Sequence, residues 1–168
     1  MPNFTYQVLK DTTKQTVIKL TGTALTSDES NSARIVANTL YRALDANNNL
    51  LTNGAVAKSY YGLSVYRVWY DVSLNAGACV YLTWSGANQV PIITMSGAGE
   101  YNAAGNWIAI PNNNTGAGVK GDIGLYSSNV SLGNYSIIVE LHKDNNYYDA
   151  GQLIEPNAFN YRPYGVTP

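Results

Sequence analysis

The chain has 168 residues and a formal net charge of −1, and only 12% of its residues are charged. This length is typical of one domain with a substantial core. The near-neutral charge argues against general electrostatic binding to nucleic acid. Because no run approaches the roughly 18–20 apolar residues of a membrane span, we expect neither nucleic acid nor a membrane as a partner.

The amino-terminal residues 1–6 lack the basic-then-apolar pattern of a signal peptide, so we expect synthesis in the cytoplasm without secretion. Cys79 is the only cysteine, and a single cysteine forms no disulfide within one chain. Its apolar neighbours favour a small core residue over a reactive thiol.

The first elements that the sequence predicts are two β-strands, over residues 5–10 and 16–25, joined by a polar turn at 11–15. Residues 27–44 are ambiguous. Ile35, Leu40 and Leu44 partly fit a helical period, but the same residues also fit two short β segments. We slightly favour the β interpretation.

Residues 62–72 alternate with the two-residue period of a strand that buries one face. One predicted face carries Tyr66, Val68, Tyr70 and Val72, and the other carries Val65, Arg67, Trp69 and Asp71. Further strands are predicted over residues 78–84, 90–95, 107–110, 122–127 and 135–143. Turns rich in Gly and Asn separate them.

Short strands at this spacing indicate an antiparallel sandwich or barrel. We therefore expect an all-β protein: one antiparallel β-sandwich domain over residues 1–151, jelly-roll-like, followed by an extended C-terminal arm over residues 152–168. The arm has three prolines and almost no hydrophobic period, yet it is too aromatic for a solvated tail. Its predicted partner-binding residues are Phe159, Tyr161, Arg162 and Tyr164.

Glu140, His142 and Asp144 alternate along the last predicted strand, so we expect all three on one face. Such a cluster could serve acid–base chemistry or hold a metal ion. However, His142 is the only histidine, and no serine motif of a hydrolytic triad accompanies it. We favour a solvent-exposed strand face.

Two loops resemble ligand-binding motifs only in part. Residues 45–49 provide the first alternating oxygen ligands of a calcium loop, but Leu50 and Val56 occupy the positions that need Gly and Glu. An Asn-rich turn is the better interpretation. Residues 116–121 lack the Gly-Lys-Ser/Thr ending of a phosphate-binding loop. The sequence therefore predicts no catalytic residue, no metal site, no cofactor and no enzyme activity.

Trp69, Trp84 and Trp107 have flat apolar rings that could stack on sugars. Trp84 shares a predicted face with Val80 and Leu82, which favours a position in the core. Trp69 alternates with Arg67 and Asp71, so its face also carries polar groups. Trp69 and Arg67 are therefore candidate glycan-binding residues.

Several segments also carry a family resemblance. They are Asp11-Thr-Thr-Lys14 with Val17-Ile-Lys-Leu-Thr-Gly22, Val80-Tyr-Leu-Thr-Trp84, Ile92-Ile-Thr-Met-Ser-Gly97 with Gly99-Glu-Tyr101, Ile110-Pro-Asn-Asn-Asn114, Gly121-Asp-Ile123, Tyr135-Ser-Ile-Ile-Val-Glu-Leu-His-Lys143 and Tyr148-Asp-Ala-Gly-Gln152 with the remaining tail to Pro168. In this order they resemble small virion structural proteins of contractile-tailed marine cyanophages and other marine phages. The closing run is the most specific part.

The resemblance implies a non-enzymatic β-sandwich component of a virus particle. The function that we expect is capsid decoration: an oligomeric cement protein, with a trimer favoured, that binds capsomer junctions on the virion surface. Its partners would be the major capsid protein and copies of itself. Two alternatives stay open: a tail, neck or baseplate component, and a glycan- or receptor-binding module that uses Trp69 and Arg67.

Overall fold

The computed structural model of the chain describes residues 3–25, 27–29, 32–73, 77–102, 105, 108–128 and 133–150. Over these residues the protein is all-β, with ten strands and one 3₁₀ turn. The elements are β1 (Asn3–Asp11), β2 (Gln15–Leu25), β3 (Ser32–Ile35), η1 (Ala37–Thr39), β4 (Leu63–Ser73), β5 (Cys79–Trp84), β6 (Val90–Met95), β7 (Gly97–Tyr101), β8 (Ile110–Pro111), β9 (Ile123–Ser128) and β10 (Gly133–Lys143).

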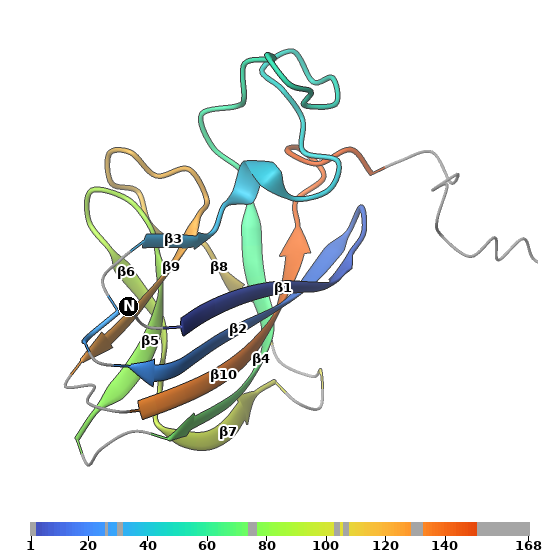
Figure 1. Ribbon diagram of the computed structural model, residues 1–168. Coiled ribbons are helices and arrows are strands. Elements are labelled where there is room, and N and C mark those ends of the chain that lie inside the picture. The colour runs from blue at the N-terminus through green and yellow to red at the C-terminus, as the bar shows by residue number, and fades with distance from the viewer. Residues whose placement is uncertain are drawn as a thin grey trace, which may run out of the picture.

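The strands form two antiparallel sheets (Figure 1). The large sheet has the order β1-β2-β10-β4-β7, with β8 also paired to β4, and the small sheet has the order β3-β9-β5-β6. Apart from the β1–β2 and β5–β6 hairpins and the short β8, the chain changes sheets between successive strands. Strands far apart in sequence are therefore neighbours, as when β10 lies between β2 and β4.

The hydrophobic core lies between the two sheets, because inward-facing residues of both sheets are buried together. Alternate residues of β10 are buried along its whole length. Fully buried core residues of the two sheets include Ile18, Leu20, Val68, Ile137, Val139, Val80, Leu82, Trp84, Ile123 and Leu125. This confirms Trp84 as a core residue. Burying each large apolar side chain in this way stabilises the folded state by roughly 1.5–3 kcal/mol.

Most of the predicted strands are present with boundaries shifted by a residue or two. Residues 27–44 contain the short strand β3 and the 3₁₀ turn η1. The prediction of strand rather than helix in this segment is therefore right for β3 only. The predicted strand at 107–110 is reduced to β8, and Trp107 lies outside the described residues. Strand β7 was not predicted, because its Gly-Ala-Gly start has no hydrophobic alternation.

A β-bulge in β4 corrects the predicted faces of that strand. Glu140 of β10 pairs with Arg67, but Leu141 pairs with Val65, which makes Tyr66 an extra residue. The bulge reverses the alternation, so Val65 is fully buried while Tyr66 is partly exposed. The prediction that Val65 shares the face of Arg67 is therefore wrong, as is the prediction that Tyr66 shares the face of the buried Val68.

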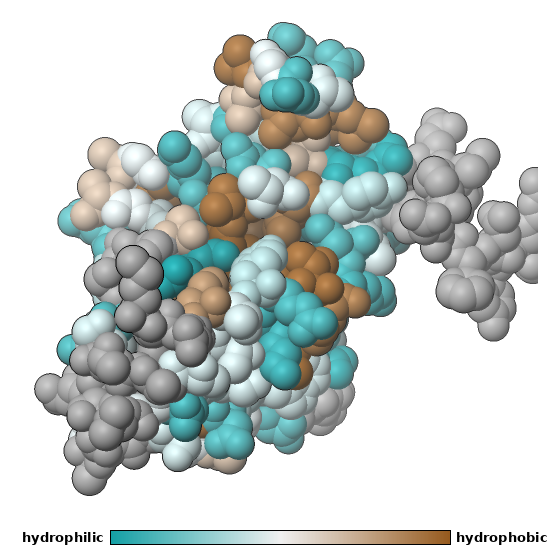
Figure 2. All heavy atoms as spheres, viewed as in Figure 1, coloured by the Kyte–Doolittle hydropathy of each residue, from teal (hydrophilic) through white to brown (hydrophobic). Residues whose placement is uncertain are grey.

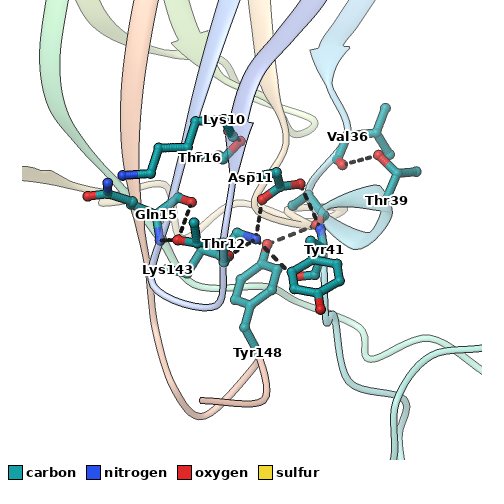
Figure 3. A network of polar contacts seen from close by, with 11 residues as sticks. Lys10, Asp11, Thr12, Gln15, Thr16, Val36, Thr39, Tyr41, Lys143 and Tyr148 are labelled. Carbon is teal, nitrogen blue, oxygen red and sulfur yellow. Dashed lines mark hydrogen bonds and ion pairs between the residues drawn. The ribbon is translucent and has the colours of Figure 1, made fainter. Parts of the chain in front are cut away.

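Lys143 closes one end of the sandwich from inside. Its fully buried ammonium group donates a hydrogen bond to Asp11 Oδ1 at 2.5 Å. It also donates to the carbonyl oxygens of Thr12 and Tyr41, at 2.7 and 2.9 Å (Figure 3). The ring of Tyr148 lies beside the charge, with its centroid 5.1 Å from Nζ. One buried charge thus joins three segments: the β1–β2 hairpin, the segment after η1 and the end of β10.

Glu29 closes the opposite end. Its buried carboxylate accepts a hydrogen bond from the Tyr135 hydroxyl at 3.0 Å and is ion-paired with Arg34 at 2.5 Å. Burial, together with the charge of Glu29, raises the pKa of Tyr135, so that hydroxyl stays protonated and remains a donor. A Cβ at Gly22 would lie only 2.3 Å from the Tyr135 ring, so glycine is required beneath the ring.

We expect Lys143→Ala to lower the free energy of unfolding by about 3 kcal/mol, because it removes one partner of a buried ion pair and leaves Asp11 without its cation. Denaturant titration followed by circular dichroism measures the loss. Lys10→Ala is the matched control, since Lys10 is an exposed lysine in β1, next in sequence to Asp11. Equal midpoints for the two variants would contradict this role of Lys143.

Candidate functional site

The outward side of the large sheet, called the outer face below, carries the two residues that the sequence predicts to bind glycans, Trp69 and Arg67. On β10 the residues between the buried positions point outward, and these include Ile138, Glu140 and His142. Beyond the bulge, β4 adds Arg67 and Trp69, both partly exposed. Trp69 and Arg67 therefore share one side of β4, as the alternation predicts, and this side is partly exposed.

The pairing register arranges this face in cross-strand rows. Trp69 lies between Ile138 of β10 and Glu100 of β7. In the next row Asp71 pairs with Ser136 on its β10 side. Directly opposite residues of antiparallel strands have Cβ atoms about 4.5–5.5 Å apart, so these side chains are in reach of one another.

A groove of about 570 Å³ lies over these two rows. Trp69 and Ile138 provide its apolar surface, and the exposed carboxylates of Asp71 and Glu100 lie at its margins. An indole face packs against the C–H surface of a sugar ring, and carboxylate oxygens accept hydrogen bonds from sugar hydroxyls. The groove therefore combines the two kinds of contact that a glycan needs.

A polar cluster borders this groove. Glu140 lies between two basic side chains, with Arg67 Nε 3.7 Å from one carboxylate oxygen and His142 Nε2 3.8 Å from the other. The His142 ring stacks on Tyr66 with centroids 4.0 Å apart, and the Arg67 guanidinium lies 5.1 Å from the Tyr66 centroid. These side chains hold one another in place, and the bulge at Tyr66 is what makes the stacking possible.

The predicted one-face arrangement of Glu140, His142 and Asp144 holds for the first two residues. Strand β10 ends at Lys143, so Asp144 lies just beyond the strand. His142 and Asp144 instead line a second pocket of about 320 Å³ at this end of the sheet. His142 and Asp144 therefore line the same pocket, but not because they alternate along one strand.

The Asp45 loop forms the Asn-rich turn that the sequence predicts. Asp45 Oδ1 accepts hydrogen bonds from the backbone amides of Asn47 and Asn49, at 2.8 and 2.9 Å. Asn48 has a φ of 64°, a left-handed conformation that asparagine tolerates. The Asp45 carboxylate thus stabilises the turn.

Within the described ranges, no group of three His, Cys, Asp or Glu residues is placed to hold a metal ion. No helix in the same part of the chain has the length and apolar character of a membrane span. The predicted arm at 152–168, with Phe159, Tyr161, Arg162 and Tyr164, lies outside the described residues.

The sequence patterns did not predict a further surface, the free edge of β1. Among the residues that the structure describes, this strand pairs only with β2, and it exposes Tyr6, Val8 and Leu9 to 40, 46 and 47%. Figure 2 shows the corresponding hydrophobic colour over the second half of the strand. The signal was the apolar content of residues 6–9, but whether a strand lies at a sheet edge depends on the whole topology.

Comparison with models of known protein families, with curated proteins and with solved structures gave no match to this chain. The function is therefore inferred from the surfaces described above.

Proposed function

We propose that the protein is a non-enzymatic structural subunit of a phage virion, and specifically a capsid decoration (cement) protein. In this proposal it binds capsomer junctions as a homo-oligomer, with a trimer favoured, and stabilises the head from the virion surface. Its partners are the major capsid protein and further copies of itself. The observation that carries the proposal is the free edge of β1.

An edge strand offers unpaired backbone groups to any neighbouring chain, and monomeric proteins usually protect such edges with charges, proline or a covering segment. Strand β1 is nine residues long and is charged only near its end, at Lys10 and Asp11. The exposed Tyr6, Val8 and Leu9 add an apolar strip to the edge. A subunit that packs against neighbours covers such a strip, whereas an isolated protein keeps it in water at a risk of aggregation.

We further propose that the two sheets form a jelly roll. Apart from β1 and β8, the large sheet has the order β2-β10-β4-β7 and the small sheet β3-β9-β5-β6. Numbered along the chain, these strands have the orders 1-8-3-6 and 2-7-4-5, which supports a wrapping of two Greek keys. Jelly rolls occur in viral capsid proteins and also in lectins, so the fold alone does not choose the function.

The C-terminal arm over residues 152–168 is the second contact in this proposal. A fully extended chain of that length reaches at most ~55–60 Å, enough to cross onto a neighbouring subunit. Ordering it costs on the order of 1–2 kcal/mol per residue in backbone entropy. Burial of Phe159, Tyr161 and Tyr164 against a partner would offset part of that cost, and Arg162 would add a polar contact.

Deleting residues 152–168 is expected to weaken attachment to phage heads at least tenfold while the body stays folded. Sedimentation of the protein with undecorated heads measures attachment, and circular dichroism checks the fold.

In cryo-electron microscopy of the particle we expect density for the full chain at capsomer junctions. Unchanged attachment of the truncated protein would contradict the role of the arm, and density confined to the neck, tail or baseplate would contradict decoration.

Val8→Lys is expected to weaken self-association at least tenfold, because it introduces a charge into the apolar edge of β1. Light scattering coupled to gel filtration measures the oligomer across a dilution series. Val56→Lys is the control, since Val56 is 74% exposed and lies outside β1. A wild-type protein that stays monomeric at all concentrations, or equal loss in both variants, would argue against the edge as an interface.

A second candidate function is a glycan- or receptor-binding module, and the groove at Trp69 is the observation that favours it. There, Trp69→Ala is expected to reduce the affinity for a host polysaccharide at least tenfold, whereas Trp69→Phe retains part of it. Tyr41→Ala is the control, because Tyr41 is an exposed aromatic residue outside the groove. An array of host polysaccharides with no binder at all would remove this candidate.

A further inference from the structure

Strand β1 carries apolar side chains on the core side of the large sheet that are left partly in solvent. Tyr6 lies directly opposite Leu20 of β2, and Val8 lies opposite Ile18. Directly opposite residues share one face of a sheet. Leu20 and Ile18 are fully buried, so Tyr6 and Val8 also point to the core side, yet they are 40 and 46% exposed. The hydrophobic core therefore ends at β2 along this stretch, one strand before the edge of the sheet (Figure 1).

The small sheet reaches only the beginning of β1. Phe4 lies on the same side, opposite Gly22, and packs against the core. The guanidinium of Arg34 in β3 lies 4.0 Å from the centroid of the Phe4 ring. Strand β3 has four residues and β1 has nine. A further extended segment beside β1 would continue the cover over the exposed part of the strand.

The backbone of β1 is open along the same stretch. Residues 3–8 pair with β2 in regular register, and a β-bulge at Leu9 interrupts the pairing. On its other side β1 has no strand partner within the described part of the chain. Residues 3–8 carry no charge, so they lack the charged side chains that commonly protect an edge. Such an edge can accept one more strand through backbone hydrogen bonds.

The C-terminal arm contains one stretch of matching length, residues 157–162, called the tail segment below. Pro156 and Pro163 bracket it, and it contains no proline itself. Because proline has no backbone N–H to donate, the tail segment is the longest run of the arm that can pair fully. Phe159 and Tyr161 are two residues apart, so they lie on one side of an extended chain. Aromatic pairs across neighbouring strands stabilise a sheet.

The chain leaves the described body at the end of the sandwich where β1 finishes. The backbone amide of Asp149 donates to the carbonyl oxygen of Arg42 at 2.9 Å. The amide of the preceding residue, Tyr41, donates to Asp11 Oδ2 at 2.8 Å, and Asp11 is the last residue of β1. Residues 151–156 span at most ~20 Å when extended. The tail segment therefore starts within reach of the β1 edge of a copy that packs at this end.

We propose that the tail segment of one copy of the chain adds as an extra strand to the free edge of β1 in a second copy. This inference rests on the proposed structural subunit, and it names what the edge of β1 binds. Phe159 and Tyr161 then cover Tyr6 and Val8, and the backbone groups of β1 gain partners. The contact joins two different surfaces, so its repetition around a closing rotation makes a ring, such as the favoured trimer.

The test mixes two full-length variants. Val8→Lys blocks the edge and keeps the tail segment, whereas the double variant Phe159→Lys, Tyr161→Lys blocks the tail segment and keeps the edge. Alone, each should self-associate at least tenfold more weakly than the wild-type protein in light scattering coupled to gel filtration. Mixed in equal amounts, they should form a complex with one copy of each, identified by native mass spectrometry. All introduced residues are lysines, so no new ion pair between the variants can produce this complex.

The double variant Val166→Lys, Thr167→Lys is the matched control, because it adds the same charges to the arm outside the tail segment. It should associate like the wild-type protein, and circular dichroism checks that every variant is folded. If Val8→Lys weakens association but Phe159→Lys, Tyr161→Lys does not, this inference fails and the edge of β1 stands as the interface.

Two further outcomes also decide between the proposals. A mixture that stays as weakly associated as its components overturns the inference, because two blocked surfaces on different copies would then fail to complement each other. A monomeric wild-type protein in which the amides of β1 exchange slowly with solvent, and exchange faster in Phe159→Lys, Tyr161→Lys, shows that the arm covers its own β1. That result overturns this inference and the edge of β1 as an interface together.

Discussion

The burial of one positive charge constrains this fold more than any other interaction. An ammonium group inside a protein costs several kcal/mol unless its partners are in place, and Lys143 finds its three hydrogen-bond acceptors in two other parts of the chain. The β1–β2 hairpin, the segment at Tyr41 and the end of β10 must therefore come together. Asp144 follows Lys143 directly and Tyr147 lies four residues after it, so the same constraint positions two residues that line the second pocket. Stability at this end of the sandwich and the geometry of the second pocket have a common origin.

The character of the outer face depends on a single extra residue. Without the bulge, strict alternation would turn either Tyr66 or Arg67 toward the core. With it, both side chains lie on the outer side, where Tyr66 stacks on His142 and Arg67 pairs with Glu140. β-Bulges often occur where a strand must redirect a side chain. The result is a fixed polar cluster between two hollows, one with an apolar surface at Trp69 and the other with hydroxyl and amide groups.

The sequence was informative wherever one strand face is buried, because alternation then reports burial directly. It located β10 and β4, distinguished the buried Trp84 from the exposed Trp69, and indicated an all-β protein. It could not find β7, whose glycines carry no period and whose place is set by pairing with β4. Nor could it assemble the second pocket, since Tyr60, Asn112 and Asp144 come from distant segments that only the crossing connections between the sheets bring together.

The position of β10 also has a mechanical consequence. This strand is the middle one of the large sheet, paired along nearly its full length with β2 on one side and β4 on the other. Tension applied to the chain beyond Ala150 first meets the ion pair of Arg42 with Asp149 and the bridge of Tyr148 to Ala43. It is then directed along the axis of β10, so two ladders of hydrogen bonds are sheared at once rather than opened one bond at a time. A subunit gripped by its carboxyl-terminal end would thus carry load through its strongest element.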